Sequence, residues 1–265
     1  MTSTQLRART RLGMEYLALM SRRTAAHLVI GNEILSGKIQ DANTFALAQE
    51  LRALGIALQR VVVIPDEIDV IAAEVNSLRN MYDYLFTSGG VGPTHDDVTI
   101  EAIGRALGRR VVRHPEVERM LRAFYGARCT EGHLRMADLV EGTRLATSEE
   151  TGVWPTFVLG NIFILPGVPE IYRMKLVTVR EILGGTEDAF VLRSVYTLGD
   201  EGAIKHWIDA VVARFPDVMV GSYPRFRDSD HSVRITFDGA DAVRVEEAAR
   251  AFAEMLPPEL LVRVE

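Results

Sequence analysis

The sequence predicts an α/β protein with two domains: a three-layer αβα domain on a mainly parallel sheet, then a small ferredoxin-like α+β domain. The first observation is that strands and helices alternate from residue 24 to about residue 107, which is the order of a parallel sheet with helices on both faces. The second is that the order changes after residue 185 to strand, helix, strand, strand, helix, strand, which is typical of a split β-α-β unit.

Apolar runs and turn residues place the individual elements. In the first domain we expect strands at 25–30, 56–64 and 84–87 and helices at 44–54, 68–78 and about 97–107. Residues 114–138 are expected to be helical and connective, 156–159 and 162–165 to form a hairpin, and 169–183 a helix. In the second domain we expect strands at 190–198, 218–223, 232–237 and 260–264 and helices at 203–215 and 242–255. Gly184 and Gly185 mark the boundary, so the expected parts are an extension at 1–23, a domain at 24–185 and a domain at 186–265.

Composition limits the class of protein. Of the 265 residues 48% are hydrophobic, and the net charge of −6 argues against a nucleic-acid partner. A single cysteine, Cys129, cannot form an internal disulfide, and no apolar run reaches the roughly 18–20 residues that span a bilayer. We therefore expect a cytoplasmic protein that does not enter the membrane. The arginine-rich residues 1–23 are compatible with a transit peptide or with a surface extension.

A glycine-rich loop is the strongest candidate for a ligand site. Gly89, Gly90 and Gly92 follow an expected strand and precede an expected helix, so the backbone can approach a ligand closely and the helix N-terminus faces the same loop. These features predict a cradle for a phosphate. The neighbouring residues expected to bind the ligand are Ser88, Pro93, Thr94 and Thr99.

Two carboxylates stand at the start of the helix that follows. Asp96 and Asp97 would repel a bound phosphate unless a divalent cation lay between them, and their hard oxygen atoms suit Mg²⁺ or Mn²⁺. The alternative is structural, because Thr94 and Asp97 have nearly the spacing of a capping box.

Two further loops follow strands and are expected at the same sheet edge. The first runs from Gly31 to Thr44 and contains Asn32, Glu33, Asp41 and Asn43; Asp41 or Asn43 could instead cap the next helix. The second, Pro166-Gly167-Val168-Pro169-Glu170, is a rigid turn in which Glu170 could be a simple first-turn acid.

Together these three loops resemble the CinA (competence/damage-inducible protein A) family, whose domain is shared with molybdopterin adenylyltransferases and molybdopterin molybdenumtransferases. The resemblance covers residues 24–185, is nearest to the short stand-alone form, and extends at 152–170 to the N-terminal domain of eukaryotic FAD synthases. The chain departs from the family pattern in having Asn32 where CinA proteins commonly have Asp, and Glu149 to Phe157 in place of an Asn-x-x-Gly-x-Ala-Pro-Gly-Phe segment. We do not expect the deamidase activity of full CinA proteins or FAD synthesis, because the domains that carry them are not in residues 1–265.

The resemblance implies a divalent-metal-dependent hydrolase of a nucleotide diphosphate linkage, with ADP-ribose or FAD as the kind of substrate. The alternative is a protein that binds molybdopterin or a nucleotide without turnover. We expect Asp96 and Asp97 to ligate Mg²⁺, Mn²⁺ or Co²⁺, and Glu33 and Asp41 to join them in catalysis. The remaining loop residues are expected to bind a phosphate-bearing nucleotide or pterin, namely Gly31, Asn32, Asn43, Ser88, Gly89, Gly90, Gly92, Pro93, Thr94, Thr99, Pro166, Gly167 and Glu170. The C-terminal unit is expected to support a homodimer or a higher homo-oligomer.

Overall fold

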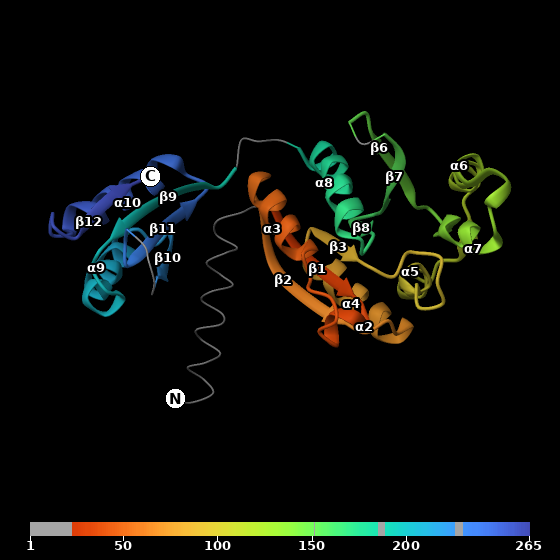
Figure 1. Ribbon diagram of the computed structural model, residues 1–265, viewed down its shortest axis with the longest axis horizontal. Helices are drawn as coiled ribbons and strands as arrows, with labels where there is room; N and C mark the ends of the chain where they lie inside the picture. The colour runs from red at the N-terminus through yellow and green to blue at the C-terminus, as the bar shows by residue number, and fades with distance from the viewer. Residues whose placement is uncertain (1–22, 151, 185–188, 226–229) are drawn as a thin grey trace. The chain divides into compact units, whose positions relative to one another are not determined.

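The computed structural model describes residues 23–150, 152–184, 189–225 and 230–265 (Figure 1). The chain divides into two compact units, one within Arg23–Gly185 and one that includes Thr186–Glu265, and each is described by itself. The predicted extension at 1–23 lies outside the described residues except for Arg23. Among the described residues, no helix is both long and apolar enough to cross a membrane.

A six-stranded sheet forms the centre of the first unit. Its order is β2 (Ile56–Ile64), β1 (Arg23–Ile30), β3 (Tyr84–Ser88), β8 (Ile162–Leu165), β7 (Gly152–Leu159) and β6 (Arg144–Ser148). The first four strands are parallel, whereas β7 and β6 are antiparallel to their neighbours. The prediction of a mainly parallel sheet with a hairpin is therefore confirmed, and β6 extends the sheet where the sequence analysis placed no strand.

Helices cover both faces of this sheet. Helices α4 (Ile68–Met81) and α5 (Thr99–Leu107) share one buried cluster with Leu28 of β1, and α3 (Asn43–Ala53) and α8 (Pro169–Leu183) share another with Ala25 of the same strand. Successive side chains of a strand point to opposite faces, so the two clusters are the two halves of an αβα sandwich. The predicted three-layer architecture is confirmed.

The stretch between α5 and β6 forms a small lobe with its own apolar cluster. It consists of β4 (Val111–Arg113), α6 (Pro115–Tyr125), η1 (Gly126–Arg128), α7 (Glu131–Leu134), η2 (Arg135–Ala137) and β5 (Asp138–Val140). β4 and β5 pair antiparallel as a separate two-stranded sheet. Strands of three residues have too short a pattern to be recognised in the sequence, which is why only helices and connections were expected here.

The second unit is a four-stranded antiparallel sheet with two helices. Its elements are β9 (Val191–Thr197), α9 (Glu201–Arg214), β10 (Met219–Pro224), β11 (Val233–Gly239), α10 (Ala242–Met255) and β12 (Leu261–Val264). The strand order β10-β11-β9-β12 places the last strand beside the first. Ile204 and Val211 of α9 pack with Phe252 of α10 in the core of this unit. This arrangement confirms the predicted ferredoxin-like α+β domain.

Candidate functional site

The loops named in the sequence analysis lie at one edge of the parallel sheet. Strands β1, β2, β3 and β8 run in the same direction and end at Ile30, Ile64, Ser88 and Leu165, so the loops after them share the carboxyl edge. Ligands of parallel α/β sheets bind at this edge, because the helices that follow the strands begin there.

The side chain of Asn43, the first residue of α3, joins three of these segments. Its amide nitrogen donates to Ser88 Oγ and to the carbonyl oxygen of Gly167, each at 2.8 Å. In addition the Gly89 N–H donates to the carbonyl oxygen of Leu165 at 3.3 Å. The structure therefore brings together four of the predicted ligand-binding residues. Asn43 is only 5% exposed and both of its side-chain N–H groups are used in these bonds. It therefore holds the loops together and is not itself available to a ligand through these groups.

Gly89 and Gly90 form a turn that only glycine can make. Their φ angles are 104° and 65°. A Cβ atom on Gly89 would lie 2.1 Å from the carbonyl oxygen of Ile30, and one on Gly90 would lie 2.3 Å from Thr99 Oγ. The Thr99 hydroxyl donates to the Gly89 carbonyl oxygen at 2.9 Å, and the Thr99 backbone N–H donates to the Gly90 carbonyl oxygen at 3.0 Å. The turn is thus fastened to the first residue of α5.

Helix α5 begins at Thr99, two residues later than expected, and no side chain caps its N-terminus. The later start arises because Asp97 is part of a separate turn: its Oδ2 accepts a hydrogen bond from the Thr94 N–H at 2.7 Å and lies 2.5 Å from the Thr94 hydroxyl oxygen, whose single hydrogen it shares with Asp96. Beyond the Thr99 N–H, which Gly90 accepts, the first turn of this helix has N–H groups without an intrahelical partner and a partial positive charge beside the glycine turn. This is the electrostatic requirement for binding an anion.

Three oxygen atoms converge in the turn before α5. Besides Asp97 Oδ2, the Oδ1 atom of Asp96 lies 2.6 Å from Thr94 Oγ. The hydrogen bond from Thr94 lowers the pKa of the Asp96 carboxyl, so this group is ionised at neutral pH. In the described part of the chain no three His, Cys, Asp or Glu side chains lie close enough to hold a metal by themselves. Two carboxylates and a hydroxyl nevertheless fit Mg²⁺, which usually retains water and takes other ligands from substrate phosphates.

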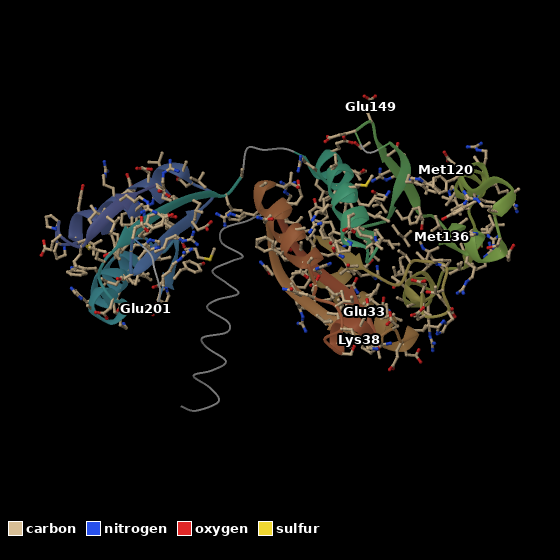
Figure 2. The ribbon with its side chains drawn as sticks, in the orientation of Figure 1. Glu33, Lys38, Met120, Met136, Glu149 and Glu201 are labelled. Atoms are coloured by element: carbon tan, nitrogen blue, oxygen red, sulfur yellow. The ribbon has the colours of Figure 1, made fainter. Side chains whose placement is uncertain are left out.

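The other predicted acids lie elsewhere on the edge. The loop after β1 contains a short helix, α2 (Asn32–Leu35), whose first N–H donates to Asp66 Oδ2 at 2.8 Å. Glu33 is exposed near Lys38 (Figure 2), with its carboxylate turned back toward Gly31. Glu170 is exposed in the first turn of α8, after Pro166 and Gly167. Within the described residues, no hydrogen bond links Glu33 or Glu170 to the Asp96–Asp97 turn.

The Asp41 side chain binds the first turn of α3 from one residue before the N-cap residue, Ala42. Its Oδ1 atom accepts hydrogen bonds from the N–H groups of Asn43 at 2.9 Å and Thr44 at 3.1 Å, and its Oδ2 atom accepts one from the Thr44 hydroxyl. The capping alternative considered for Asp41 therefore describes its contacts, while a catalytic role for it remains a prediction.

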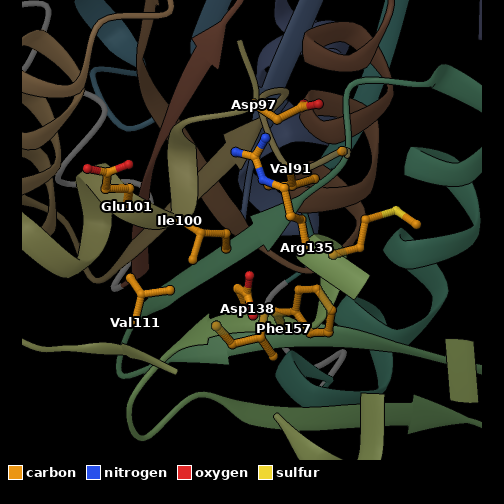
Figure 3. A pocket seen from close by; sticks show the side chains of 11 residues that line it. Val91, Asp97, Ile100, Glu101, Val111, Arg135, Asp138 and Phe157 are labelled. Carbon is orange, nitrogen blue, oxygen red and sulfur yellow. The ribbon is translucent and has the colours of Figure 1, made fainter. Parts of the chain in front are cut away.

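A cavity of about 350 Å³ opens beside the glycine-rich loop (Figure 3). Val91, Gly92 and Asp97 line one part of the cavity, and the Arg135 guanidinium lies beside them (Figure 3), donating to the Thr94 carbonyl oxygen at 3.2 Å. The remaining lining residues are Ile100, Glu101, Val111, Met136, Asp138, Leu139 and Phe157. Pro93 and Thr94 are exposed at its rim. The sequence analysis missed Arg135 and Phe157, because neither belongs to a recognisable motif and both reach the cavity only through the fold.

Comparison with known proteins agrees with this architecture. A family described as "Probable molybdopterin binding domain" matches residues 26–183, more than half of the chain. The chain belongs to this family. Residues 189–265 match a second family, described as "FAD synthase, middle domain". The molybdopterin-binding-type protein is CinA-like, as its loops predicted, and it superimposes with a TM-score of 0.56 on a crystal structure titled as CinA of unknown function from Thermoplasma acidophilum. That structure is 28% identical, and the match covers 61% of this chain and 98% of the other.

Two relatives describe how far the similarity extends. A protein of Archaeoglobus fulgidus is 33% identical over 86% of this chain and 95% of its own length. A Caenorhabditis elegans protein named "Probable FAD synthase" is 30% identical over 89% of this chain but only 50% of its own length. The CinA-like chain therefore spans about half of the FAD synthase that it matches.

Proposed function

We propose that this CinA-like protein hydrolyses a diphosphate linkage in a nucleotide such as ADP-ribose or FAD, with a divalent cation held by Asp96 and Asp97. The observation that carries the proposal is the convergence of Asp96 Oδ1 and Asp97 Oδ2 on Thr94 Oγ, at 2.6 and 2.5 Å, immediately before an uncapped helix N-terminus. Relatives named as FAD synthase support a nucleotide ligand.

The chain's own groups would bind and orient the substrate. The N–H groups of Gly90 and Gly92 and of the second and third residues of α5 hold one phosphate, and the Arg135 guanidinium beside Asp97 attracts the negative charge of the second. A bound Mg²⁺, Mn²⁺ or Co²⁺ would polarise a phosphoryl oxygen and make a bound water more acidic. In the reaction a water oxygen bonds to one phosphorus, the bridging P–O bond breaks, and two monophosphates leave. Exposed Glu101 on the cavity wall is available to accept the water proton.

A second candidate function is binding without turnover, of molybdopterin or of a nucleotide. It is favoured by the small number of carboxylates at the turn, since only Asp96 and Asp97 approach the same atom while Glu33 and Asp41 lie on the loop after β1. Backbone N–H groups can hold a phosphate whether or not it is hydrolysed.

One experiment separates the two functions. The full chain is incubated with ADP-ribose, FAD and related nucleotide diphosphates in Mg²⁺, Mn²⁺ or Co²⁺, and released monophosphate is measured, with a chelator-treated sample as the control. We expect metal-dependent release. If no substrate is hydrolysed, calorimetry with the same compounds and with pterin phosphates tests the binding function, and the absence of both turnover and binding would reject the site.

We also propose that the CinA-like chain forms a homodimer or a higher homo-oligomer. The β-α-β-β-α-β unit within 189–265 motivates this proposal, because its sheet has free edges at β10 and β12. Light scattering that finds only monomer at micromolar concentration would contradict it.

A further inference from the structure

A histidine lies in the middle of a buried strand of the first unit. His27 is 0% exposed in β1, between Ala26 and Leu28, which are also fully buried. An apolar side chain would fill this position without requiring any partner, whereas a buried polar ring costs about 1–3 kcal/mol unless it is hydrogen-bonded. Both ring nitrogens have partners: Nδ1 lies 2.9 Å from Thr44 Oγ and Nε2 lies 3.2 Å from the Tyr172 hydroxyl.

The hydrogen bonds of this group have one direction. The Thr44 hydroxyl has a single hydrogen, and it donates that hydrogen to the Asp41 carboxylate, which can only accept. Thr44 Oγ must therefore accept from His27, which places the ring proton on Nδ1. Nε2 is then an acceptor, and the Tyr172 hydroxyl donates to it. The neutral ring that this order requires agrees with the pKa of His27, which burial lowers to about 4.

The chain of hydrogen bonds ends at the candidate site. Tyr172 belongs to α8 and is fully buried, while Asp41 is half-buried at the carboxyl edge and binds the first turn of α3 through the N–H groups of Asn43 and Thr44. Asn43 in turn binds Ser88 and Gly167. His27 is thus connected through Thr44 and Asp41 to the residue that holds the site loops together.

We propose that His27 is a positioning residue: the directed chain from Tyr172 through His27 and Thr44 to Asp41 fixes the start of α3 and, through Asn43, the geometry of the phosphate site. The effect on the ligand rests on the proposed function, but the direction of the hydrogen bonds does not. His27 touches neither the cavity nor the Asp96–Asp97 turn in this arrangement, so it acts through other residues.

The direction of these hydrogen bonds is tested by nitrogen NMR of the full protein. We expect the His27 ring to carry its proton on Nδ1, with no titration between pH 5.5 and 8. A proton on Nε2, or titration near the ordinary pKa, would overturn the proposal whatever the protein binds.

The positioning effect is tested with two substitutions at the same place. His27→Leu fills the core but cannot donate to Thr44, whereas His27→Asn retains a donor near the position of Nδ1. We expect His27→Leu to accelerate hydrogen exchange at the Asn43 and Thr44 amides. We also expect it to weaken the binding of AMP about ten- to hundredfold, which is the usual effect of removing a residue that supports the ligand-binding residues. His27→Asn should restore most of both properties. Unchanged exchange and affinity in His27→Leu would overturn the proposal.

Two comparisons make the result unambiguous. If His27→Leu does not fold, Tyr172→Phe removes only the donor to Nε2 and leaves the bond from Nδ1 to Thr44, so we expect changes of the same sign but smaller size, with Tyr82→Phe, another buried tyrosine of this unit, as the matched control. If the wild-type chain does not bind AMP, the proton position from NMR and the exchange rates still decide the positioning role.

Discussion

The side-chain nitrogen of Asn43 lies 2.8 Å from the hydroxyl oxygen of Ser88, which connects the first residue of α3 to the last residue of β3. Both side chains are buried, at 5% and 3% exposure, so the hydrogen bond is shielded from water. This contact and the bond from Asn43 to Gly167 are what make a single site of three loops that are separate in the sequence.

The bond between Asn43 and Ser88 should be measurable as a coupling. We expect Asn43→Ala to lower the free energy of unfolding of this unit by about 2–4 kcal/mol, because it also leaves the Gly167 carbonyl without its donor, and Ser88→Ala by about 1 kcal/mol. A double-mutant cycle should give a coupling of about 1 kcal/mol. Fully additive losses would show that the contact does not contribute.

Gly89→Ala should destabilise the protein far more than the same change at Gly37. A Cβ on Gly89 would meet the Ile30 carbonyl oxygen at 2.1 Å, in addition to the strain of a φ of 104°. Gly37 also has a positive φ, of 71°, but nothing lies within 4 Å of its Cβ position. We expect a loss of at least about 3 kcal/mol for Gly89→Ala and about 1 kcal/mol for Gly37→Ala in chemical denaturation. Equal losses would contradict the clash.

Asp97→Asn tests whether this residue binds a metal or only stabilises the turn. Asparagine keeps an acceptor for the N–H and hydroxyl of Thr94, so the melting temperature without metal should stay near that of the wild type. Loss of the charge should weaken Mn²⁺ binding and lower turnover by orders of magnitude. Glu116→Gln, an exposed acid of α6, is the control. Full activity with unchanged metal dependence would remove Asp97 from the proposed site.

Arg135→Gln should weaken ligand binding without affecting the fold. Arg135 is exposed and bonds only the Thr94 carbonyl oxygen among the described contacts, so its loss should change the melting temperature little. Because it faces the cavity with a full positive charge, we expect about tenfold weaker AMP binding and a reduced salt dependence. Arg119→Gln, on the exposed side of α6, should leave both unchanged.

His27 should make the first unit less stable in mild acid. Burial lowers its pKa from 6.5 to about 4, against a smaller opposing influence of Asp41. Below pH 6.5 the unfolded chain therefore takes up a proton that the folded chain excludes, and the free energy of unfolding falls by up to about 3 kcal/mol as the pH approaches 4. A Trp207→Phe background lets Trp154 report on this unit alone during urea unfolding.

The matched variant for this pH dependence is His27→Leu, which should flatten the profile between pH 6.5 and 4. His206→Gln replaces an exposed histidine of the second unit and should not change it. An identical slope in His27→Leu and the wild type would assign the acid sensitivity to other groups.

The fold could be predicted from the sequence wherever periodic patterns were long. The strand Ile56–Ile64 was expected at its observed bounds, and α4 starts where expected at Ile68, because apolar spacing and a following turn residue define both. The start of α5 was placed too early, since Asp97 forms a turn with Thr94 and does not enter the helix. The hydrogen bonds of this turn join residues that are close in the sequence, but the spacing of apolar residues does not show whether Asp97 forms a turn or enters the helix.

The site was only half accessible to the same reasoning. Glycines after a strand reveal a ligand loop because their conformation is a backbone requirement. Arg135 could not be recognised in this way, since it is 41 residues from Thr94 in the sequence and only the packing of the small lobe brings the two together. The role of His27 was hidden for a similar reason: its partners Thr44 and Tyr172 come from two helices, and no spacing rule relates them.

The turn at Gly89 and Gly90 limits which parts of the site can be changed by substitution. Neither position accommodates a Cβ atom without a clash, so the turn offers the same backbone to every ligand and cannot be changed by substitution without a large loss of stability. The cavity wall at Met136 and Phe157 carries no such restriction. A library confined to those two positions should therefore yield variants that exchange one ligand for another while still binding phosphate, and the glycine turn should persist unaltered in all of them.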